Sequence, residues 1–339
     1  MPEIRKHPVT REWVIIAAER AKRPSDFGTH DVSPVKAVKD INCPFCPDNE
    51  SMIPPPVEVL NNQQSEWQIK AIPNKFPALV LDGDINRKDV GIYDTMNGIG
   101  AHEIIIETPD HSKSIPKMND SEMINVIEMY CKRYNELKKD KRFKNIQIFK
   151  NYGKIAGASL AHPHSQIIAT PFNPPEEWAD IRGIKDYLSY RKKCPFCDVV
   201  EHERKANVRI VLENESFIAT TPYASRFPFE IWIIPKKHSP VFARINDKEI
   251  NDFALILRGV IGKLSSCLSD PPFNYAIHTA PSNDEDAYNF HWHLEIIPRL
   301  TITAGFELGT GVYINIVAPE KAASFLKESS ESGATVVPA

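Results

Sequence analysis

The chain carries one sequence pattern twice, and this repetition constrains its fold more than any other feature. The tetrapeptide Cys43-Pro-Phe-Cys46 recurs as Cys194-Pro-Phe-Cys197. After each pair comes a proline-containing turn and then an apolar segment that ends in His-Ser, at residues 102–112 and 229–239. Apolar, β-branched segments of this kind are typical of strands. A tandem duplication accounts for this order most simply.

Each half continues with a helix and further strands. Residues 119–122 (Asn-Asp-Ser-Glu) and 246–249 (Asn-Asp-Lys-Glu) are rich in N-cap residues and mark two helix starts. The apolar residues that follow recur every three or four positions, which is the spacing of one helix face. They stand at 123, 127, 130, 134 and 137 and at 253, 257, 260 and 264. Strands are expected next at 145–150 and 274–278.

This order of elements predicts an α+β fold. In each half strands precede and follow one helix, which fits an antiparallel sheet with the helix packed on one side. We therefore divide the chain into an N-terminal half, residues 1–171, and a C-terminal half, residues 172–339. Two such copies could pair edge to edge and form one long sheet.

Composition excludes several classes of function. The 339 residues are 42% hydrophobic and 25% charged, which is ordinary for a soluble globular protein. The net charge of −3 argues against a nucleic acid or a membrane surface as a partner. No apolar run approaches the roughly 18 residues of a membrane span. The N-terminus lacks the apolar core of a signal peptide, so we expect a cytoplasmic protein.

The segment 157–171 holds the most distinctive side chains. Its apolar part, 166–169, reads as a strand in which alternate residues share a face, so His162, His164 and Gln166 would project side by side. The small residues at 157–159 suit a loop whose backbone amides approach a phosphate. The pattern predicts a phosphate-handling site. The alternative is a pair of structural histidines on a half-exposed strand.

The two Cys-x-x-Cys pairs predict two metal sites, because in a reducing compartment such pairs more often bind a metal than form disulfides. Histidines recur at matching offsets: His162 follows His111 by 51 residues, and His291 follows His238 by 53. Two cysteines and two histidines make a closed tetrahedral zinc site, so we assign zinc a structural role. The expected sets are Cys43, Cys46, His111 and His162, and Cys194, Cys197, His238 and His291.

A rival to the second metal site is present in the sequence. His278, His293 and Glu295 could bind a metal together with Glu176 or Glu177. Two thiolates bind zinc more tightly than scattered carboxylates, so the cysteine-containing set is preferred. Iron is an alternative to zinc. The remaining cysteines, Cys131 and Cys267, lie in helical patterns and are expected to be buried without a role.

His164 has the properties of a nucleophile toward phosphorus, since a neutral imidazole can attack through one nitrogen while the other is held by an acceptor. Attack on a nucleoside diphosphate sugar would give a nucleotidyl-histidine and release a sugar 1-phosphate, with little need for acid or base. Gln166 can donate a hydrogen bond to a phosphoryl oxygen but cannot shuttle a proton, which favours transfer over hydrolysis. The second half has Glu295 at the corresponding position, where it would repel a phosphate. We therefore expect one active site per chain.

These residues resemble a known family. His162-Pro-His164-Ser-Gln166 is similar to the His-Pro-His-x-Gln signature of the galactose-1-phosphate uridylyltransferases, a branch of the histidine-triad superfamily. The resemblance implies two tandem histidine-triad-like half-domains. Further motifs occur in the family's order along nearly the whole chain: Arg20-Ala-Lys-Arg23-Pro24, Cys43-Pro-Phe-Cys46, Pro73-Asn74-Lys-Phe76, Gly157-Ala-Ser159 and Gly305-Phe306-Glu307.

The resemblance also implies an activity and roles for individual residues. UDP-glucose and galactose 1-phosphate would exchange in a ping-pong reaction, with His164 as the uridylylated nucleophile and Gln166 as the stabiliser of that intermediate. The family is typically a homodimer in which the partner supplies part of the hexose site, here Phe306 and Glu307. By this resemblance Asn74 and Phe76 would bind the nucleoside. The residues that would bind the phosphates are Arg20, Arg23, Asn151, Gly157 and Ser159.

Departures from the family pattern leave the substrate open. Thr301 stands where better-known members carry a lysine, and the ending at 309–315 resembles a sub-branch that includes an ADP-glucose phosphorylase. Pro163 favours the uridylyl branch. Uridylyl transfer from a UDP-sugar to a hexose 1-phosphate is therefore our prediction, and adenylyl transfer to phosphate is the alternative. Alternatives of other kinds are a histidine-triad hydrolase and a zinc-stapled nucleotide-binding module without catalysis.

Overall fold

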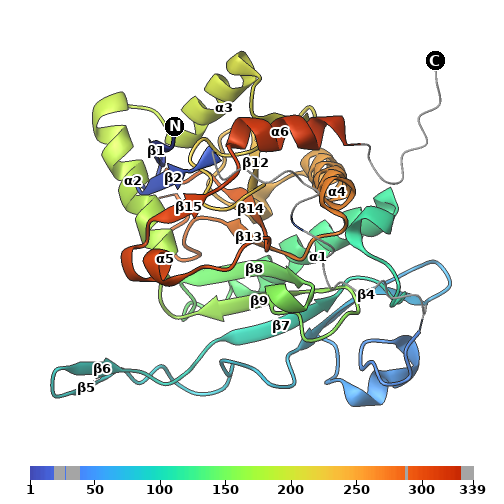
Figure 1. Cartoon of the computed structure of the whole chain (residues 1–339). Helices are drawn as coiled ribbons and strands as arrows, with labels where there is room; N and C mark the ends of the chain where they lie inside the picture. The colour runs from blue at the N-terminus through green and yellow to red at the C-terminus, as the bar shows by residue number, and fades with distance from the viewer. Residues whose placement is uncertain (19–26, 28–38, 287–288, 330–339) are drawn as a thin grey trace.

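One large antiparallel sheet organises the molecule in the computed structural model, which describes residues 1–18, 27, 39–286 and 289–329 (Figure 1). Its ten strands lie in the order β10-β11-β12-β14-β13-β8-β9-β7-β4-β3. From the N-terminal half come β3 (Glu58–Asn61), β4 (Trp67–Pro73), β7 (Ala101–Ile106), β8 (Asn145–Tyr152) and β9 (His164–Thr170). From the C-terminal half come β10 (Ile210–Glu213), β11 (Phe217–Thr220), β12 (Ile231–Pro235), β13 (Phe273–His278) and β14 (His293–Pro298).

The sheet repeats itself about its centre, the antiparallel pair β8–β13. Outward from β8 the order is β9, β7, β4, β3, and outward from β13 it is β14, β12, β11, β10. Equivalent strands of the two halves therefore hold equivalent places on either side of the central pair. The predicted α+β class and the predicted edge-to-edge pairing of two copies are confirmed.

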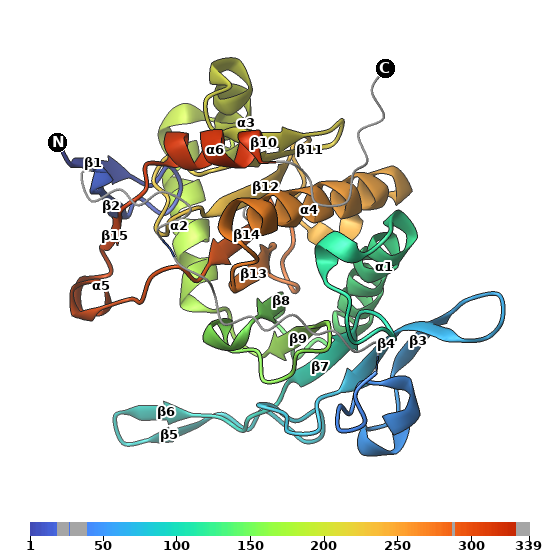
Figure 2. The same ribbon diagram turned by 45° about the vertical axis from the view of Figure 1, so that its right-hand side comes forward.

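Two long helices cover one face of the sheet. They are α1 (Asp120–Leu137) and α4 (Asp247–Leu268), which pack against each other (Figure 2). Asn119 and Asn246 cap them, each in a reciprocal pair of hydrogen bonds with the glutamate three residues later. The predicted apolar faces of both helices are buried. No helix in the described part of the chain is long and apolar enough to cross a bilayer.

Alternation along the strands divides the side chains between a covered and an open face of the sheet. On β9, Ile167 and Ala169 join the same apolar core as α1 and α4, as do Ile146 and Ile148 of β8. Side chains of opposite parity, such as Gln166, project from the other face. This alternation places Gln166 on the face of the sheet that the two helices leave uncovered.

The two ends of the chain meet in a second, three-stranded sheet. β2 (Trp13–Ile16) lies between β1 (Glu3–Lys6) and β15 (Tyr313–Asn315), antiparallel to the first and parallel to the second. The guanidinium group of Arg5 adds a bond of 2.9 Å to Glu320 at the start of α6 (Pro319–Glu328).

The remaining elements connect or flank the two sheets. The hairpin β5–β6 (Lys88–Val90 and Tyr93–Thr95) extends away from the body of the molecule (Figures 1 and 2). The helices α2 (Pro175–Arg191), α3 (Pro195–Ala206) and α5 (Gly305–Thr310) all belong to the second half. Short 3-10 helices are η3 (Pro47–Met52), η4 (Ile115–Lys117), η5 (Lys154–Ala156) and η6 (Phe242–Arg244).

Candidate active site and metal centres

His164, the predicted nucleophile, is the first residue of β9 and is 6% exposed. Its Nδ1–H donates to the backbone oxygen of His162 at 2.8 Å, so Nε2 keeps its lone pair. The ring of Phe45 meets the imidazole edge to face at 5.4 Å. Burial first, and then the nearby Lys150 ammonium, lowers the pKa of His164. The side chain is therefore a neutral imidazole with one free nitrogen at pH 7.

A buried ion pair lies on the helix side of β9, the strand that begins at His164. Lys150 of β8 and Glu107, which follows β7, come from the two strands on either side of β9. The Lys150 ammonium donates to the Glu107 carboxylate at 2.6 Å. The same ammonium donates to the backbone oxygen of His164 at 2.8 Å. Tyr130 of α1 donates to Glu107 at 3.3 Å and lies 2.6 Å from the hydroxyl of Tyr275. This network fixes the start of β9, and neither Lys150 nor Glu107 is among the predicted residues.

The substitution Lys150→Met is expected to lower the free energy of unfolding by about 3–5 kcal/mol, because it leaves the charge of Glu107 buried without a partner. The double variant Lys150→Met/Glu107→Leu should recover a large part of that loss, since the orphaned charge is removed. Denaturant unfolding of the three proteins checks this expectation. A double variant no more stable than the single one would contradict it.

The first predicted metal group is assembled beside β9. The ligand atoms of Cys43, Cys46, His111 and His162 all lie within 4.8 Å of one another, and all four side chains are buried. Cys46 Sγ is 3.4 Å from His111 Nδ1 and 3.7 Å from His162 Nδ1, and the two histidine nitrogens are 3.2 Å apart. Tetrahedral bonds of about 2.0–2.3 Å put ligand atoms about 3.3–3.8 Å apart, so these residues could hold a metal.

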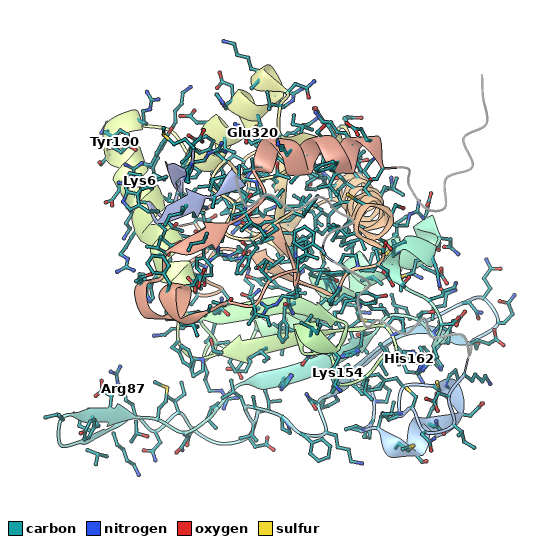
Figure 3. The ribbon with its side chains drawn as sticks, in the orientation of Figure 1. Lys6, Arg87, Lys154, His162, Tyr190 and Glu320 are labelled. Atoms are coloured by element: carbon teal, nitrogen blue, oxygen red, sulfur yellow. The ribbon has the colours of Figure 1, made fainter. Side chains whose placement is uncertain are left out.

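The hydrogen bonds around His162 select which of its nitrogens would bind the metal. Its Nε2–H donates to the backbone oxygen of Thr108 at 2.8 Å, which leaves Nδ1 for the ion. Figure 3 shows His162 next to the cysteine-bearing loop at the edge of the sheet. Because its own backbone oxygen accepts the His164 Nδ1–H, the metal group is one hydrogen bond away from His164.

The second predicted metal group has the same construction. Cys194, Cys197, His238 and His291 also bring their ligand atoms within 4.8 Å. Cys197 Sγ lies 3.6 Å from His238 Nδ1 and 3.5 Å from His291 Nδ1, and His291 Nε2–H donates to the backbone oxygen of Pro235 at 3.0 Å. The local structures differ, because Cys194 holds the N-cap position of an α-helix whereas Cys46 holds that of a 3-10 helix. This group could hold a metal as well.

The rival group is also partly assembled, with a different carboxylate. Asp180 of α2, His278 and His293 bring ligand atoms within 4.8 Å. The carboxylate of Glu295 lies 3.4 Å from His278, but its other oxygen accepts a bond of 2.8 Å from Arg226. The group faces a pocket of about 370 Å³ that Glu176 and Glu177 also line. Asp180 was not among the predicted residues, because no local sequence pattern indicates where α2 packs against the sheet.

The predicted phosphate residues lie at the end of β8 and in the loop that follows. Gly157 has φ of 90°, a left-handed conformation that favours glycine, and a side chain there would meet Asn151 Nδ2 at 3.7 Å. The oxygen of the Asn151 amide accepts a bond of 2.8 Å from Asn274 of β13. The Asn151 NH₂ group is thereby turned toward the loop that also carries the exposed Ser159. Arg20 and Arg23 lie outside the described residues.

Gln166, on β9, shares a hydrogen-bond cluster with His102 of β7. The Gln166 carbonyl oxygen is 2.9 Å from His102 Nε2. Asn74, a predicted nucleoside residue, places its amide nitrogen 3.0 Å from the same ring, and its own carbonyl oxygen accepts the backbone N–H of Phe76 at 3.0 Å. Phe76 is 83% exposed and therefore free to stack on a base. His102 was not among the predicted residues.

The predicted hexose residues lie apart from this cluster. Phe306 and Glu307 belong to α5, which packs on β15. The Glu307 carboxylate accepts the backbone N–H of Ala304 at 3.1 Å and so caps its own helix. Among the described residues no hydrogen bond or ion pair joins either side chain to β9. Their assignment to the hexose stays a prediction.

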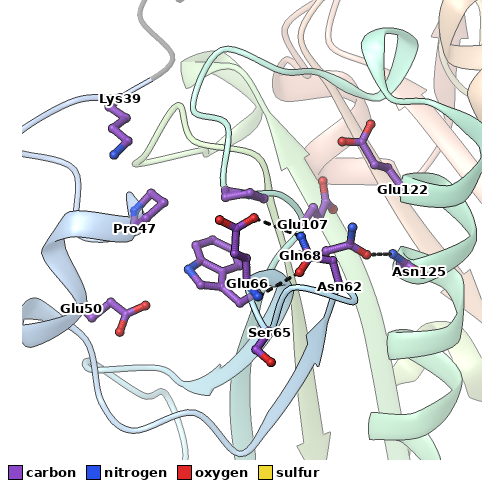
Figure 4. A pocket seen from close by; sticks show the side chains of 12 residues that line it. Lys39, Pro47, Glu50, Asn62, Ser65, Glu66, Gln68, Glu107, Glu122 and Asn125 are labelled. Atoms are coloured by element: carbon purple, nitrogen blue, oxygen red, sulfur yellow. Dashed lines mark hydrogen bonds between the residues drawn. The ribbon is translucent and has the colours of Figure 1, made fainter.

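A pocket of about 590 Å³ opens beside the cysteine-bearing loop (Figure 4). Four carboxylates line it, those of Glu50, Glu66, Glu107 and Glu122, and Lys39 faces them. Three of these carboxylates are already paired with lysines, Glu50 with Lys70, Glu107 with Lys150 and Glu122 with Lys113. None of the predicted nucleotide-binding residues lines this pocket, so it is not the candidate nucleotide site.

Comparison with characterised proteins agrees with this arrangement. An ADP-glucose phosphorylase of Arabidopsis thaliana is 37% identical over 334 residues, with 97% of this chain and 93% of that protein covered. A galactose-1-phosphate uridylyltransferase of Thermotoga maritima is 34% identical over 339 residues, with 97% and 99% covered. The crystal structure of the Arabidopsis phosphorylase with bound ADP-glucose superimposes with a TM-score of 0.84 at 35% identity, covering 97% and 100%. A uridylyltransferase structure gives a TM-score of 0.73 at 25% identity, covering 96% and 97%.

Two family models account for the two halves of the chain. The model described as "Galactose-1-phosphate uridyl transferase, N-terminal domain" matches residues 1–174. The corresponding C-terminal domain model matches residues 180–331. Together with the whole-length relatives, these matches show that the chain belongs to the galactose-1-phosphate uridylyltransferase family of nucleotidyltransferases.

Proposed function

We propose that this protein transfers a nucleoside monophosphate from a nucleoside diphosphate hexose to a phosphate-bearing acceptor, through a covalent intermediate on His164. The observation that carries this proposal is the state of that imidazole. Its Nδ1–H is held by the backbone oxygen of His162 at 2.8 Å, and within the described residues no hydrogen bond occupies Nε2. A buried, neutral histidine with one free nitrogen is suited to attack on phosphorus.

Each half of the reaction makes one bond to phosphorus and breaks another. His164 Nε2 forms a bond to the α-phosphorus, and the oxygen that bridges to the β-phosphate leaves with the electron pair as hexose 1-phosphate. A phosphate oxygen of the acceptor then attacks the same phosphorus and displaces His164. Both the leaving and the attacking oxygens belong to phosphates, so no side chain has to move a proton. The chain supplies positioning and amide donors, from Gln166 and Asn151.

Two substrate pairs fit this chemistry. The first candidate is UDP-glucose with galactose 1-phosphate, supported by both family models and by the Thermotoga relative. The second is ADP-glucose with phosphate, supported by the 37% identity and the TM-score of 0.84 to the Arabidopsis phosphorylase. Both share the attack by His164, so they differ in the base and in the acceptor alone.

We further propose that the two Cys₂His₂ groups hold structural zinc. Two thiolates and two imidazoles are a donor set that zinc favours and that leaves no open position for a substrate. Bound zinc would clamp the cysteine-bearing loops to the strands that follow His162 and His291. A homodimer in which Phe306 and Glu307 reach the hexose of the partner's site belongs to the same proposal.

Labelling of the enzyme distinguishes the candidates. The protein is incubated with UDP-glucose or ADP-glucose labelled in the α-phosphate, and the label retained after denaturation is measured at high and at low pH. We expect acid-labile label from one of the two nucleotides, and its discharge by galactose 1-phosphate if the base is uracil or by phosphate if it is adenine. If the label is lost to water without an acceptor as fast as it is lost with one, the protein is a hydrolase. Binding of a nucleotide sugar with no retained label would indicate a binding module.

A further inference from the structure

We propose that His102 is a positioning residue for Gln166: its imidazole fixes which end of the Gln166 amide faces the reacting phosphoryl group. This inference deepens the proposed function and rests on it for its catalytic meaning. It concerns one hydrogen-bond cluster, formed by β7, β9 and the loop 74–78 that follows β4. The orientation of a glutamine amide is a decisive property at such a site, because one end donates and the other accepts.

The backbone determines the tautomer of His102. The N–H of Ala78 donates to His102 Nδ1 at 3.1 Å, and a backbone N–H can only donate. Nδ1 is therefore the unprotonated nitrogen, and the proton of the neutral ring lies on Nε2. That Nε2–H faces the Gln166 carbonyl oxygen at 2.9 Å. The Gln166 oxygen is thus engaged as an acceptor from His102.

The consequence for catalysis follows from the geometry of the amide. With its oxygen directed at His102, Gln166 has its NH₂ group left to donate to a non-bridging oxygen on phosphorus. The opposite orientation would direct the carbonyl oxygen at that negative group and repel it. A donor that is already aimed at the developing charge lowers the barrier without reorganisation.

The same imidazole is attached to the loop predicted to bind the nucleoside. In addition to the Ala78 bond, the backbone N–H of Asn74 donates to the His102 backbone oxygen at 2.8 Å. The amide nitrogen of Asn74 packs 3.0 Å and 3.4 Å from the two ring nitrogens. His102 therefore joins the loop that carries Asn74 and Phe76 to the amide beside the nucleophile.

The second half of the chain offers an internal comparison. In the sheet, Trp232 lies opposite Glu295 as Ile104 lies opposite Gln166, so Glu230 holds the place of His102 and Glu295 that of Gln166. The carboxylate of the buried Glu230 accepts the backbone N–H groups of Arg226 and Phe227, while Glu295 accepts its bond from the Arg226 side chain at 2.8 Å. The histidine and the glutamine thus occur together in the half that carries the nucleophile, and both are replaced in the other half.

NMR spectroscopy can determine the tautomer of His102 without any catalytic turnover. Protein labelled with ¹⁵N in histidine is examined by long-range ¹H–¹⁵N correlation, and His102→Gln identifies the signal. We expect His102 to be neutral with its proton on Nε2 in the free protein. A proton on Nδ1 would overturn the proposal, because Gln166 would then have to donate to the ring.

A double-mutant cycle tests the catalytic consequence. His102→Leu is expected to slow single-turnover labelling of His164 by about 10- to 100-fold, since one aligned donor is lost. In a Gln166→Leu background the same change should slow labelling no further, and His102→Gln, which restores a donor, should recover much of the rate. Equal losses in both backgrounds would overturn the proposal. A wild-type protein that forms no adduct would refute the proposed function, while the histidine spectrum would still decide the role of His102.

Discussion

The substitution His164→Ala is expected to abolish formation of the labelled intermediate and to lower turnover at least about 10⁴-fold, because no other group can take over a lost nucleophile. The remaining binding residues stay in place, so affinity for the nucleotide sugar should change little. Rapid-quench labelling and equilibrium binding measure the two quantities separately.

The repeat provides a matched control in His293→Ala. His293 holds the equivalent position in β14, and its Nδ1 lies 3.2 Å from the backbone oxygen of His291, just as His164 relates to His162. Glu295 stands near it in place of a glutamine, so we expect labelling within a few-fold of wild type. Loss of label in His293→Ala at unchanged thermal stability would show that the second half takes part in the chemistry.

The substitution Cys46→Ser is expected to lower the bound metal by one ion per chain and the free energy of unfolding by about 5 kcal/mol or more, since metal binding is coupled to folding. Cys46 Sγ is the atom that approaches both His111 and His162 in the first group. Because His162 also holds His164, the labelling rate should fall together with stability. Metal analysis, denaturant unfolding and single-turnover labelling check the three parts.

Two variants serve as controls for this expectation. Cys194→Ser should also remove one ion and destabilise the protein, with a smaller effect on labelling, because the second group lies beside β14. Cys131→Ala alters a buried cysteine of α1 that belongs to neither group and should leave the metal content unchanged. An unchanged metal content in Cys46→Ser would refute the assignment of the first site.

Much of this fold could be predicted because its signals are local or repeated. The caps Asn119 and Asn246 and the apolar faces of α1 and α4 follow from spacing within single helices. The two Cys₂His₂ groups needed a further step, since cysteines and histidines far apart in sequence had to be matched. The duplication supplied that match, because each offset could be compared with its counterpart.

The parts that were missed depend on how strands and loops meet. Lys150 occupies a core-facing position of β8, and its partner Glu107 lies across a third strand whose register no local pattern reveals. His102 acts through the loop 74–78, whose return to β7 is visible only in three dimensions. The burial of Lys150 could nevertheless have been predicted. A lysine on the same strand face as Ile146 and Ile148 indicates a buried charge that requires a partner.

The pairing of β2 with β15 at the two chain ends has a consequence for how the protein can be divided into fragments. Because β2 is hydrogen-bonded to β15, residues from the first half are built into the second. Cleavage of the polypeptide between β9 and α2 would therefore yield two fragments that remain joined by the β2–β15 and β8–β13 strand pairs. Co-expression of the two fragments, and not either one alone, is the arrangement in which the half that carries His164 should be recovered in folded form.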